Sequence, residues 1–171
     1  MALTLSNPDY DSERLYAVVR SILASSELCS MATLAEDGAP HINTAYFALD
    51  DELRLYFLSN PASLHCRNIA RRPRMAVAVF DTHQPWGSPG TGLQLFGTGG
   101  AATGDAEPRA RQVYGTRFPL FGEFSKSPGA PSAGPSFRLL RLYEFTPVEV
   151  KILDEEGLAD EVNVTAAIRR W

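Results

Sequence analysis

The hydrophobic positions of this chain first follow a helical repeat and then change to the pattern of strands. Apolar residues between Leu15 and Ile22 recur at the i, i+3, i+4 and i+7 spacing, which predicts a helix over residues 11–25. Asp11 or Ser12 can cap its first turn, because their side-chain oxygens accept hydrogen bonds from free backbone amides.

Three short apolar segments follow this helix, separated by acidic turns. They are Leu28–Leu34, His41–Leu49 and Leu53–Leu58. Asp37-Gly38 lies between the first two segments and is a strong hairpin signal, because glycine accepts the positive φ of a tight turn. Strands joined by such short turns run antiparallel, so we predict a three-stranded meander.

The middle of the chain breaks this pattern with a helix and then returns to strands. Asn60 and Pro61 are typical of a helix start, which predicts a short helix over residues 62–71 ending before Pro73. Two further strands are predicted at Met75–Phe80 and Gly92–Gly99, around a Gly/Pro-rich loop over residues 81–92.

The remaining pattern predicts a helix over 106–116, a long loop over 118–136, strands at Phe137–Phe145 and Val148–Leu153, and a short terminal helix at Val162–Trp171. Many strands, few helices and no βαβ alternation indicate a mainly β protein, an antiparallel β-barrel formed by one domain over residues 1–171. A barrel of this size has little room inside. We therefore expect a ligand on its outside or at a subunit interface.

Composition narrows the functional classes. The chain has 171 residues, of which 44% are hydrophobic and 21% charged, as in ordinary globular proteins. A net charge of -4 without a Lys/Arg block argues against nucleic-acid binding, and no apolar run is long enough to cross a membrane. The N-terminal segment lacks the pattern of a signal peptide, so we expect a cytoplasmic protein with Cys29 and Cys66 as buried free thiols.

No catalytic motif is present. The sequence contains no nucleophile elbow, zinc-protease motif, C-x-x-C pair or P-loop. His41, His65 and His83 do not have the spacing of metal ligands, so we expect no metal site. No side chain is assigned a catalytic role.

A candidate anion site lies where the third strand turns into the second helix. The amides of a helix N-terminus attract anions, and Ser59, Ser63, His65 and Arg67 add side-chain donors nearby. Together they could hold a phosphate dianion. The alternative is an ordinary helix cap with polar residues exposed on the surface.

A second candidate lies in the strand at Asn43–Ala48. Its polar and aromatic residues could support an isoalloxazine ring and hydrogen-bond its pyrimidine edge, although a plain amphipathic strand has the same pattern. Gln94 could reach a ring carbonyl or simply be exposed. Trp86 could cover a ring or pack on its own loop.

At these residues the chain resembles the pyridoxamine 5'-phosphate oxidase-like FMN-binding split-barrel family, from about residue 12 to residue 102. The ordered segments that carry the resemblance are Leu28–Leu34, Gly38-Ala39-Pro40, Asn43–Leu49, Leu53–Leu58, Ser59–His65, Asn68-Ile69, Pro73, Met75–Phe80 and Leu93–Gly97. The resemblance implies a homodimer with two FMN sites at the interface and a small-molecule substrate. The residues assigned to the cofactor are Asn43, Thr44, Ala45, Tyr46, Phe47, Leu58, Ser59, Ser63, Leu64, His65, Asn68 and Gln94.

Two departures from the oxidases change the functional expectation. The oxidases have a lysine where this chain has His65, and the tail at Val162–Trp171 does not reproduce their substrate-binding segment. We therefore expect an FMN-dependent oxidoreductase of another substrate. The alternatives are a deazaflavin-dependent reductase, with Arg67, Arg71, Arg72 and Arg74 near the longer cofactor, and a non-catalytic flavin-binding or sensor protein. The family also includes haem-degrading relatives, so the fold alone does not define the cofactor.

Overall fold

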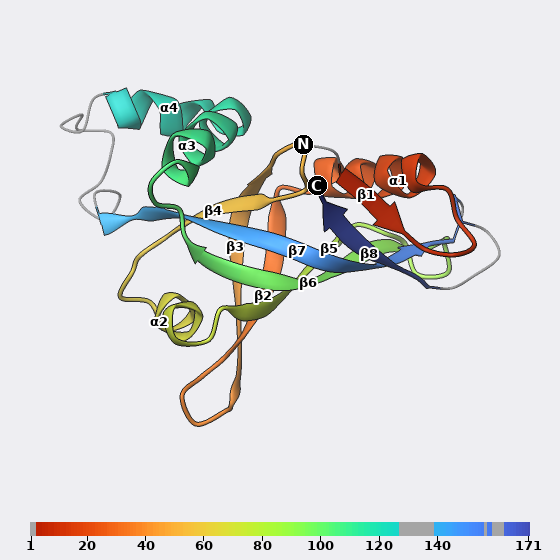
Figure 1. Cartoon of the computed structure of the whole chain (residues 1–171), viewed down its shortest axis with the longest axis horizontal. Helices are drawn as coiled ribbons and strands as arrows, with labels where there is room; N and C mark the ends of the chain where they lie inside the picture. The colour runs from red at the N-terminus through yellow and green to blue at the C-terminus, as the bar shows by residue number, and fades with distance from the viewer. Residues whose placement is uncertain (1–2, 127–138, 156, 159–162) are drawn as a thin grey trace.

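A computed structural model describes residues 3–126, 139–155, 157–158 and 163–171 (Figure 1). The strands are β1 (Leu3–Ser6), β2 (Leu28–Leu34), β3 (Pro40–Leu49), β4 (Leu55–Ser59), β5 (Arg74–Phe80), β6 (Thr91–Ala101), β7 (Arg141–Asp154) and β8 (Val164–Arg170). The helices are α1 (Ser12–Ser25), α2 (Leu64–Arg71), α3 (Ala106–Arg117) and α4 (Pro119–Lys126).

The strands form a closed antiparallel barrel, as predicted. Six of them are hydrogen-bonded in the order β7-β4-β3-β2-β5-β6, and pairing of β6 with β7 closes the ring. Strands β8 and β1 extend the sheet from β7 beyond this ring. The barrel interior is filled by apolar side chains, among them Phe47, Phe57 and Phe145, each at most 1% exposed. A ligand must therefore bind outside this core.

The first helix forms as its pattern predicts. The Asp11 carboxylate accepts hydrogen bonds from the amides of Glu13 and Arg14 at 2.9 and 3.0 Å, which caps the helix. Its buried side chains, Leu15, Val19 and Leu23, belong to the barrel core. This helix thus lies against the barrel along its apolar side.

Strands β2, β3, β5 and β6 present one side of the sheet to the outside. Facing pairs such as Leu28–Tyr46, Ser30–Ala78 and Ala76–Phe96 share this side, while the intervening residues point inward. We call this side the outer sheet face; it consists of Leu28, Ser30, Ala32, Leu34, Ile42, Thr44, Tyr46, Ala76, Ala78, Phe80, Gln94 and Phe96. None of these side chains is charged, and the exposed Arg74 lies on the same side at the start of β5, opposite Thr98.

The barrel is split between β3 and β4. The two strands pair only where Phe47–Leu49 meets Leu55–Phe57, whereas β3 pairs with β2 from Pro40 to Tyr46. The first half of β3 therefore diverges from the end of β4. Helix α2 follows β4 directly at this opening.

The C-terminal prediction was wrong. Val164–Arg170 is strand β8 and not a helix, because Val164, Ala166 and Ile168 point into the core in a period of two while β7 and β1 supply backbone partners. Strand β1, which pairs with β8, was not predicted.

Smaller differences concern element boundaries. The two predicted strands around residue 146 form one strand, β7, which bulges opposite Phe96 and Gly97. Part of the predicted 118–136 loop is helix α4, and residues 127–138 lie outside the described residues. Helix α2 begins at Leu64, and β4 begins at Leu55 because Leu53 has a φ of 58°.

Both cysteines are buried and free. Across the described part of the chain, no helix has the length and apolar character needed to span a bilayer.

Candidate functional site

Three predicted side chains converge where β4 passes into α2. Ser59 Oγ lies 2.6 Å from His65 Nε2, and Ser63 Oγ lies 3.1 Å from the same nitrogen. The two hydroxyl oxygens are 3.3 Å apart. Ser59, Ser63 and His65, which we call the hydroxyl–imidazole cluster, therefore form one hydrogen-bonding group.

A turn between β4 and α2 creates this convergence. The Asn60 carboxamide accepts a hydrogen bond from the Ala62 amide at 2.9 Å, and the Ser63 amide donates to the Asn60 carbonyl at 2.9 Å. Asn60 thus shapes the turn, while Ser63 occupies the cap position of α2. The Ser63 hydroxyl makes no capping bond, because it lies against His65 instead. The first amides of α2 keep their partial positive charge without a side-chain acceptor.

Two further polar residues belong to this environment, although sequence reasoning missed them. Burial alone would raise the pKa of the Cys66 thiol, but hydrogen bonds with His65, Ser59, Ser63 and Tyr143 outweigh it and lower the pKa to about 7. Burial and the contact with Cys66 raise the pKa of Tyr143. Tyr143 belongs to β7, so no local sequence signal could have placed it here.

Strand β3 lies across the opening from this cluster. The His41 ring is parallel to the His65 ring, with an interplanar angle of 7° and centroids 6.3 Å apart. Two residues further on, Asn43 carries a buried Oδ1 atom without a hydrogen-bond partner. Buried polar atoms usually have a partner. The orphaned oxygen is thus an unused acceptor in the same half of β3 as His41.

The other predicted residues of β3 lie on two sides of the sheet. Thr44 and Tyr46 belong to the outer sheet face, whereas Ala45 and Phe47 point inward. Gln94 is also on the outer face, in the cross-strand row that runs from Thr44 through Ser30 and Ala78. Three strand spacings of about 4.8 Å place Thr44 and Gln94 about 14 Å apart along that row.

Three predicted residues lie away from the hydroxyl–imidazole cluster. Asn68 is buried and donates through Nδ2 to Thr33 Oγ1 at 3.1 Å, so it joins α2 to β2. Leu58 packs against the apolar cluster of α3 and α4. Leu64 is exposed in the first turn of α2.

The arginines in α2 and directly after it are largely engaged within the chain. Arg67 donates to the Ala62 carbonyl, and Arg71 forms an ion pair with Glu36. Arg72 donates to the carbonyls of Ala35 and Glu36 in the β2–β3 hairpin at 3.1 and 3.2 Å. Arg67 therefore does not point into the hydroxyl–imidazole cluster as we predicted.

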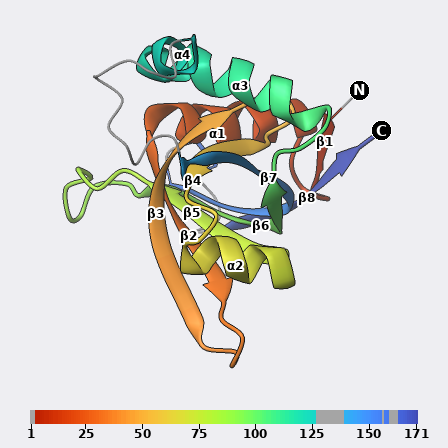
Figure 2. The ribbon, with the colours of Figure 1, turned by 90° about the vertical axis from the view of Figure 1, so that its left-hand side faces the viewer.

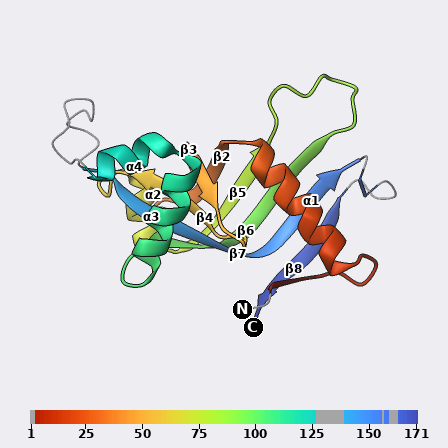
Figure 3. The same cartoon turned by 90° about the horizontal axis from the view of Figure 1, so that it is seen from above.

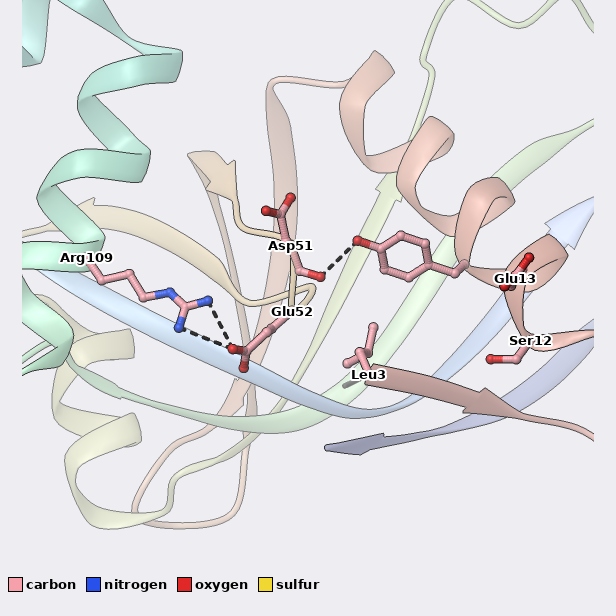
Figure 4. A pocket seen from close by; sticks show the side chains of 7 residues that line it. Leu3, Ser12, Glu13, Asp51, Glu52 and Arg109 are labelled. Carbon is pink, nitrogen blue, oxygen red and sulfur yellow. Dashed lines mark hydrogen bonds and ion pairs between the residues drawn. The ribbon is translucent and has the colours of Figure 1, made fainter. Parts of the chain in front are cut away.

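A separate cavity of about 620 Å³ lies between α1, β1 and the β3–β4 turn. Figure 4 shows Arg109 reaching from α3 to the Glu52 carboxylate, which lies 3.3 Å away. Arg109 also pairs with the buried Asp50 at 2.8 Å, so these charges are already compensated. This cavity contains none of the predicted cofactor residues. In the described ranges, no group of three His, Cys, Asp or Glu side chains is arranged to hold a metal ion.

The donors at the barrel opening fit the phosphate end of a flavin. Phosphate oxygens accept hydrogen bonds from hydroxyls, imidazole and helix amides, all of which meet at the start of α2. The orphaned Asn43 carboxamide lies on the strand that would run beside such a ligand, where its Oδ1 still requires a donor. The site therefore contains both donors and an unused acceptor.

Solved structures share this fold at low sequence identity. A heme-binding protein from Mycobacterium smegmatis matches 92% of this chain with 17% identity and a TM-score of 0.68, and the chain covers 59% of that protein. A protein of the pyridoxinephosphate oxidase family from Clostridium acetobutylicum, related to general stress protein 26, matches with 15% identity and a TM-score of 0.60, covering 90% of this chain and 94% of that one. An F420 reductase matches with 21% identity and a TM-score of 0.53, covering 77% and 94%.

Sequence comparison identifies the family directly. No curated protein matches the chain in sequence. The pyridoxamine 5'-phosphate oxidase family model, however, matches residues 15–154, which include the barrel opening, α2 and the outer sheet face. The chain therefore belongs to the pyridoxamine 5'-phosphate oxidase family, as its split barrel and the order of its segments indicate.

Proposed function

We propose that this protein is an FMN-dependent oxidoreductase that holds the cofactor phosphate at the hydroxyl–imidazole cluster. The observation that carries the proposal is the convergence of Ser59, Ser63 and His65 within 3.3 Å of one another at an uncapped helix start. A phosphate dianion would replace their mutual hydrogen bonds with charge-assisted ones, which are stronger.

Helix α2 supplies the phosphate site with little formal positive charge, because the Arg67 guanidinium bonds to the Ala62 carbonyl. Attraction comes from the α2 amides, from the imidazoles of His41 and His65, and from Arg141, which lies opposite Ser59 in the β4–β7 ladder. An imidazole gives a phosphate less charge than a lysine ammonium does. We therefore expect FMN affinity to increase if His65 is replaced by lysine.

The rest of the proposed site lies along β3 and requires a second copy of the chain. Six large apolar side chains of the outer sheet face are 38–69% exposed, and Arg74 lies beyond them at the start of β5. A largely apolar face of this kind is typical of an interaction surface. We propose that two copies pair through it with two-fold symmetry, with each flavin ring at the edge of the interface beside Asn43–Ala48.

The protein's part in the reaction would be to bind and orient. FMN, when bound, supplies hydride or electron transfer. Ser59, Ser63 and His65 would hold the phosphate, and Asn43 would orient the part of FMN that joins the phosphate to the ring. The paired outer faces would exclude water from the ring. No side chain needs to act as a general acid or base, which is consistent with the lack of a catalytic motif.

Flavin binding by a double variant tests this proposal. Replacement Ser63→Ala with His65→Ala removes two donors, and the dissociation constant for FMN should rise at least about tenfold. Thr116→Ala with Thr165→Ala removes two exposed hydroxyls, on α3 and β8, that do not belong to the proposed site and serves as the control. Equal FMN affinity in the folded double variant and the control would contradict the proposal.

The two alternatives make different predictions for the same protein. The F420 reductase with this fold suggests a deazaflavin, and a lower dissociation constant for deazaflavin than for FMN would favour that cofactor. FMN is our preference, because Arg67, Arg71 and Arg72 are already bonded within the chain. A sensor would retain FMN but would not be reduced by NADH or NADPH, which anaerobic bleaching of the flavin measures.

A further inference from the structure

Cys66 lies beside the hydroxyl–imidazole cluster, in the first turn of α2. Figure 2 and Figure 3 both show this helix against the barrel and away from α1, and Cys66 belongs to its buried side. The Cys66 side chain is 3% exposed and packs in the barrel core, yet it forms hydrogen bonds with Ser59, Ser63 and His65. The thiol therefore contacts, from the core side, all three groups that we propose for the cofactor phosphate.

Other polar groups reach this region from β7 and β3. Tyr143 of β7 is 6% exposed and forms a hydrogen bond with Cys66. Arg141, two residues earlier on β7, lies at the phosphate site, and β3 brings His41 parallel to the His65 ring. A thiolate and a phosphate would therefore compete for the same positive charge.

The remaining elements around α2 bring no charge to the thiol. Strands β2 and β6 pack against this helix, and neither contains a charged side chain. Their one ionisable group is Cys29, which stays neutral because burial raises its pKa to about 12. The charge state of Cys66 is thus the feature of this core region that can change near neutral pH.

A thiol and a thiolate leave the cluster with different hydrogen bonds. A thiolate only accepts, so the hydroxyl hydrogens of Ser59 and Ser63 turn toward the sulfur. These are the hydrogens that would bind phosphate oxygens. The thiolate also places a negative charge beside the position of a dianion, where partial burial strengthens the repulsion. Both effects weaken phosphate binding.

We propose that Cys66 sets the pH range of FMN binding, because the neutral thiol permits the phosphate to bind and the thiolate opposes it. This inference rests on the proposed function, since it concerns the same phosphate site. The pKa of Cys66, lowered to about 7, places the change near neutral pH. Cys66 acts through Ser59, Ser63 and His65, so it is a positioning residue with no part in electron transfer.

Dissociation constants for FMN between about pH 6 and pH 9 test the proposal. Cys66→Ser retains a hydrogen-bonding group that does not ionise in this range. The ratio of the dissociation constant of the unmodified protein to that of Cys66→Ser should rise about tenfold from pH 6 to pH 9. Titration of the phosphate itself occurs with both proteins and cancels in this ratio. Cys29→Ser is the matched control and should follow the unmodified protein.

Riboflavin separates the phosphate from the ring. It has no phosphate, so its ratio for the same two proteins should stay constant between pH 6 and pH 9. A riboflavin ratio that rises as much as the FMN ratio would mean that Cys66 acts on the ring, which overturns the proposal.

Inorganic phosphate gives a readout without a flavin. Because the thiolate opposes phosphate, bound phosphate must favour the neutral thiol. At a phosphate concentration that displaces FMN, ultraviolet absorbance should show the thiol that titrates near pH 7 shifted upward by about one pH unit. Chloride at equal ionic strength should leave it unchanged. This measurement uses the unmodified protein, so it decides the question even if Cys66→Ser does not fold.

The outcomes separate this inference from the proposed function. If the unmodified protein binds FMN, a constant FMN ratio or a thiol titration that phosphate does not shift overturns the inference alone. Absence of FMN binding by the unmodified protein at every pH overturns the proposed function and the inference together.

Discussion

The two cysteines show how strongly the surroundings of a thiol control its pKa. Burial raises the pKa of Cys29 to about 12, and its hydrogen bond with the Ala45 carbonyl does not compensate. Cys66 is equally buried, at 3% exposed, yet its four polar neighbours lower its pKa to about 7. One thiol therefore remains protonated near neutral pH while the other ionises.

Ultraviolet absorbance of the thiolate should detect this difference. Between about pH 7 and pH 9 the protein should show one ionising thiol, which Cys66→Ser removes and Cys29→Ser retains. The folded pKa of Cys66 lies below the ordinary value of 9.0, so its ionisation stabilises the fold fully above pH 9, and this contribution is lost as the pH falls through 7. A thiol that titrates near pH 9 in Cys29→Ser would contradict the assignment.

At the scale of residues, sequence could predict only what lies close along the chain. Ser59, Ser63 and His65 fall within seven consecutive residues, so a strand end followed by a helix start was enough to bring them together. Tyr143 joins this site through the pairing of Phe57 in β4 with β7, which the sequence does not specify. For Asn43, the strand was predicted but the orphaned oxygen depends on tertiary packing.

At the scale of elements, the hairpins followed from local turn chemistry, whereas the ends of the chain did not. Gly38 has a φ of 87°, as the predicted tight turn requires. Strand β8 contains two alanines and a short pattern that is also compatible with a helix, and its pairing with β7 and β1 decides its conformation. Tertiary pairing of this kind outweighs local propensity.

Closure of the barrel by β6 and β7 depends on one glycine. A Cβ atom added at Gly97 would lie 2.1 Å from the Thr146 carbonyl oxygen and 2.7 Å from Pro147 Cα, both backbone atoms of the β7 bulge. Gly97→Ala should therefore lower the free energy of unfolding by about 1–3 kcal/mol. Gly100→Ala in the same strand meets no atom within 4 Å and should have little effect, as chemical denaturation of both variants would show. Equal stability of the two variants would mean that the bulge can shift to accept a side chain.

At the scale of the whole molecule, the filled barrel and the exposed outer sheet face both link cofactor binding to the pairing of two copies. The core residues leave no room for a cofactor inside, and the donors of the candidate site lie at the split between β3 and β4. The outer face begins on the same strand, β3, and continues across β2, β5 and β6. Cofactor binding and pairing of two copies should therefore depend on each other.

A charge placed on the outer face tests this dependence. Ile42 lies on that face and is 69% exposed, so Ile42→Glu costs little in one copy but would bury two carboxylates in a pair. We expect this variant to sediment as a folded monomer and to lose most of its FMN affinity. Leu120→Glu changes a 65% exposed leucine on α4, away from the outer face, and should remain a dimer that binds FMN. A dimeric Ile42→Glu variant would place the interface elsewhere, and a monomer with unchanged FMN affinity would confine the cofactor site to one copy.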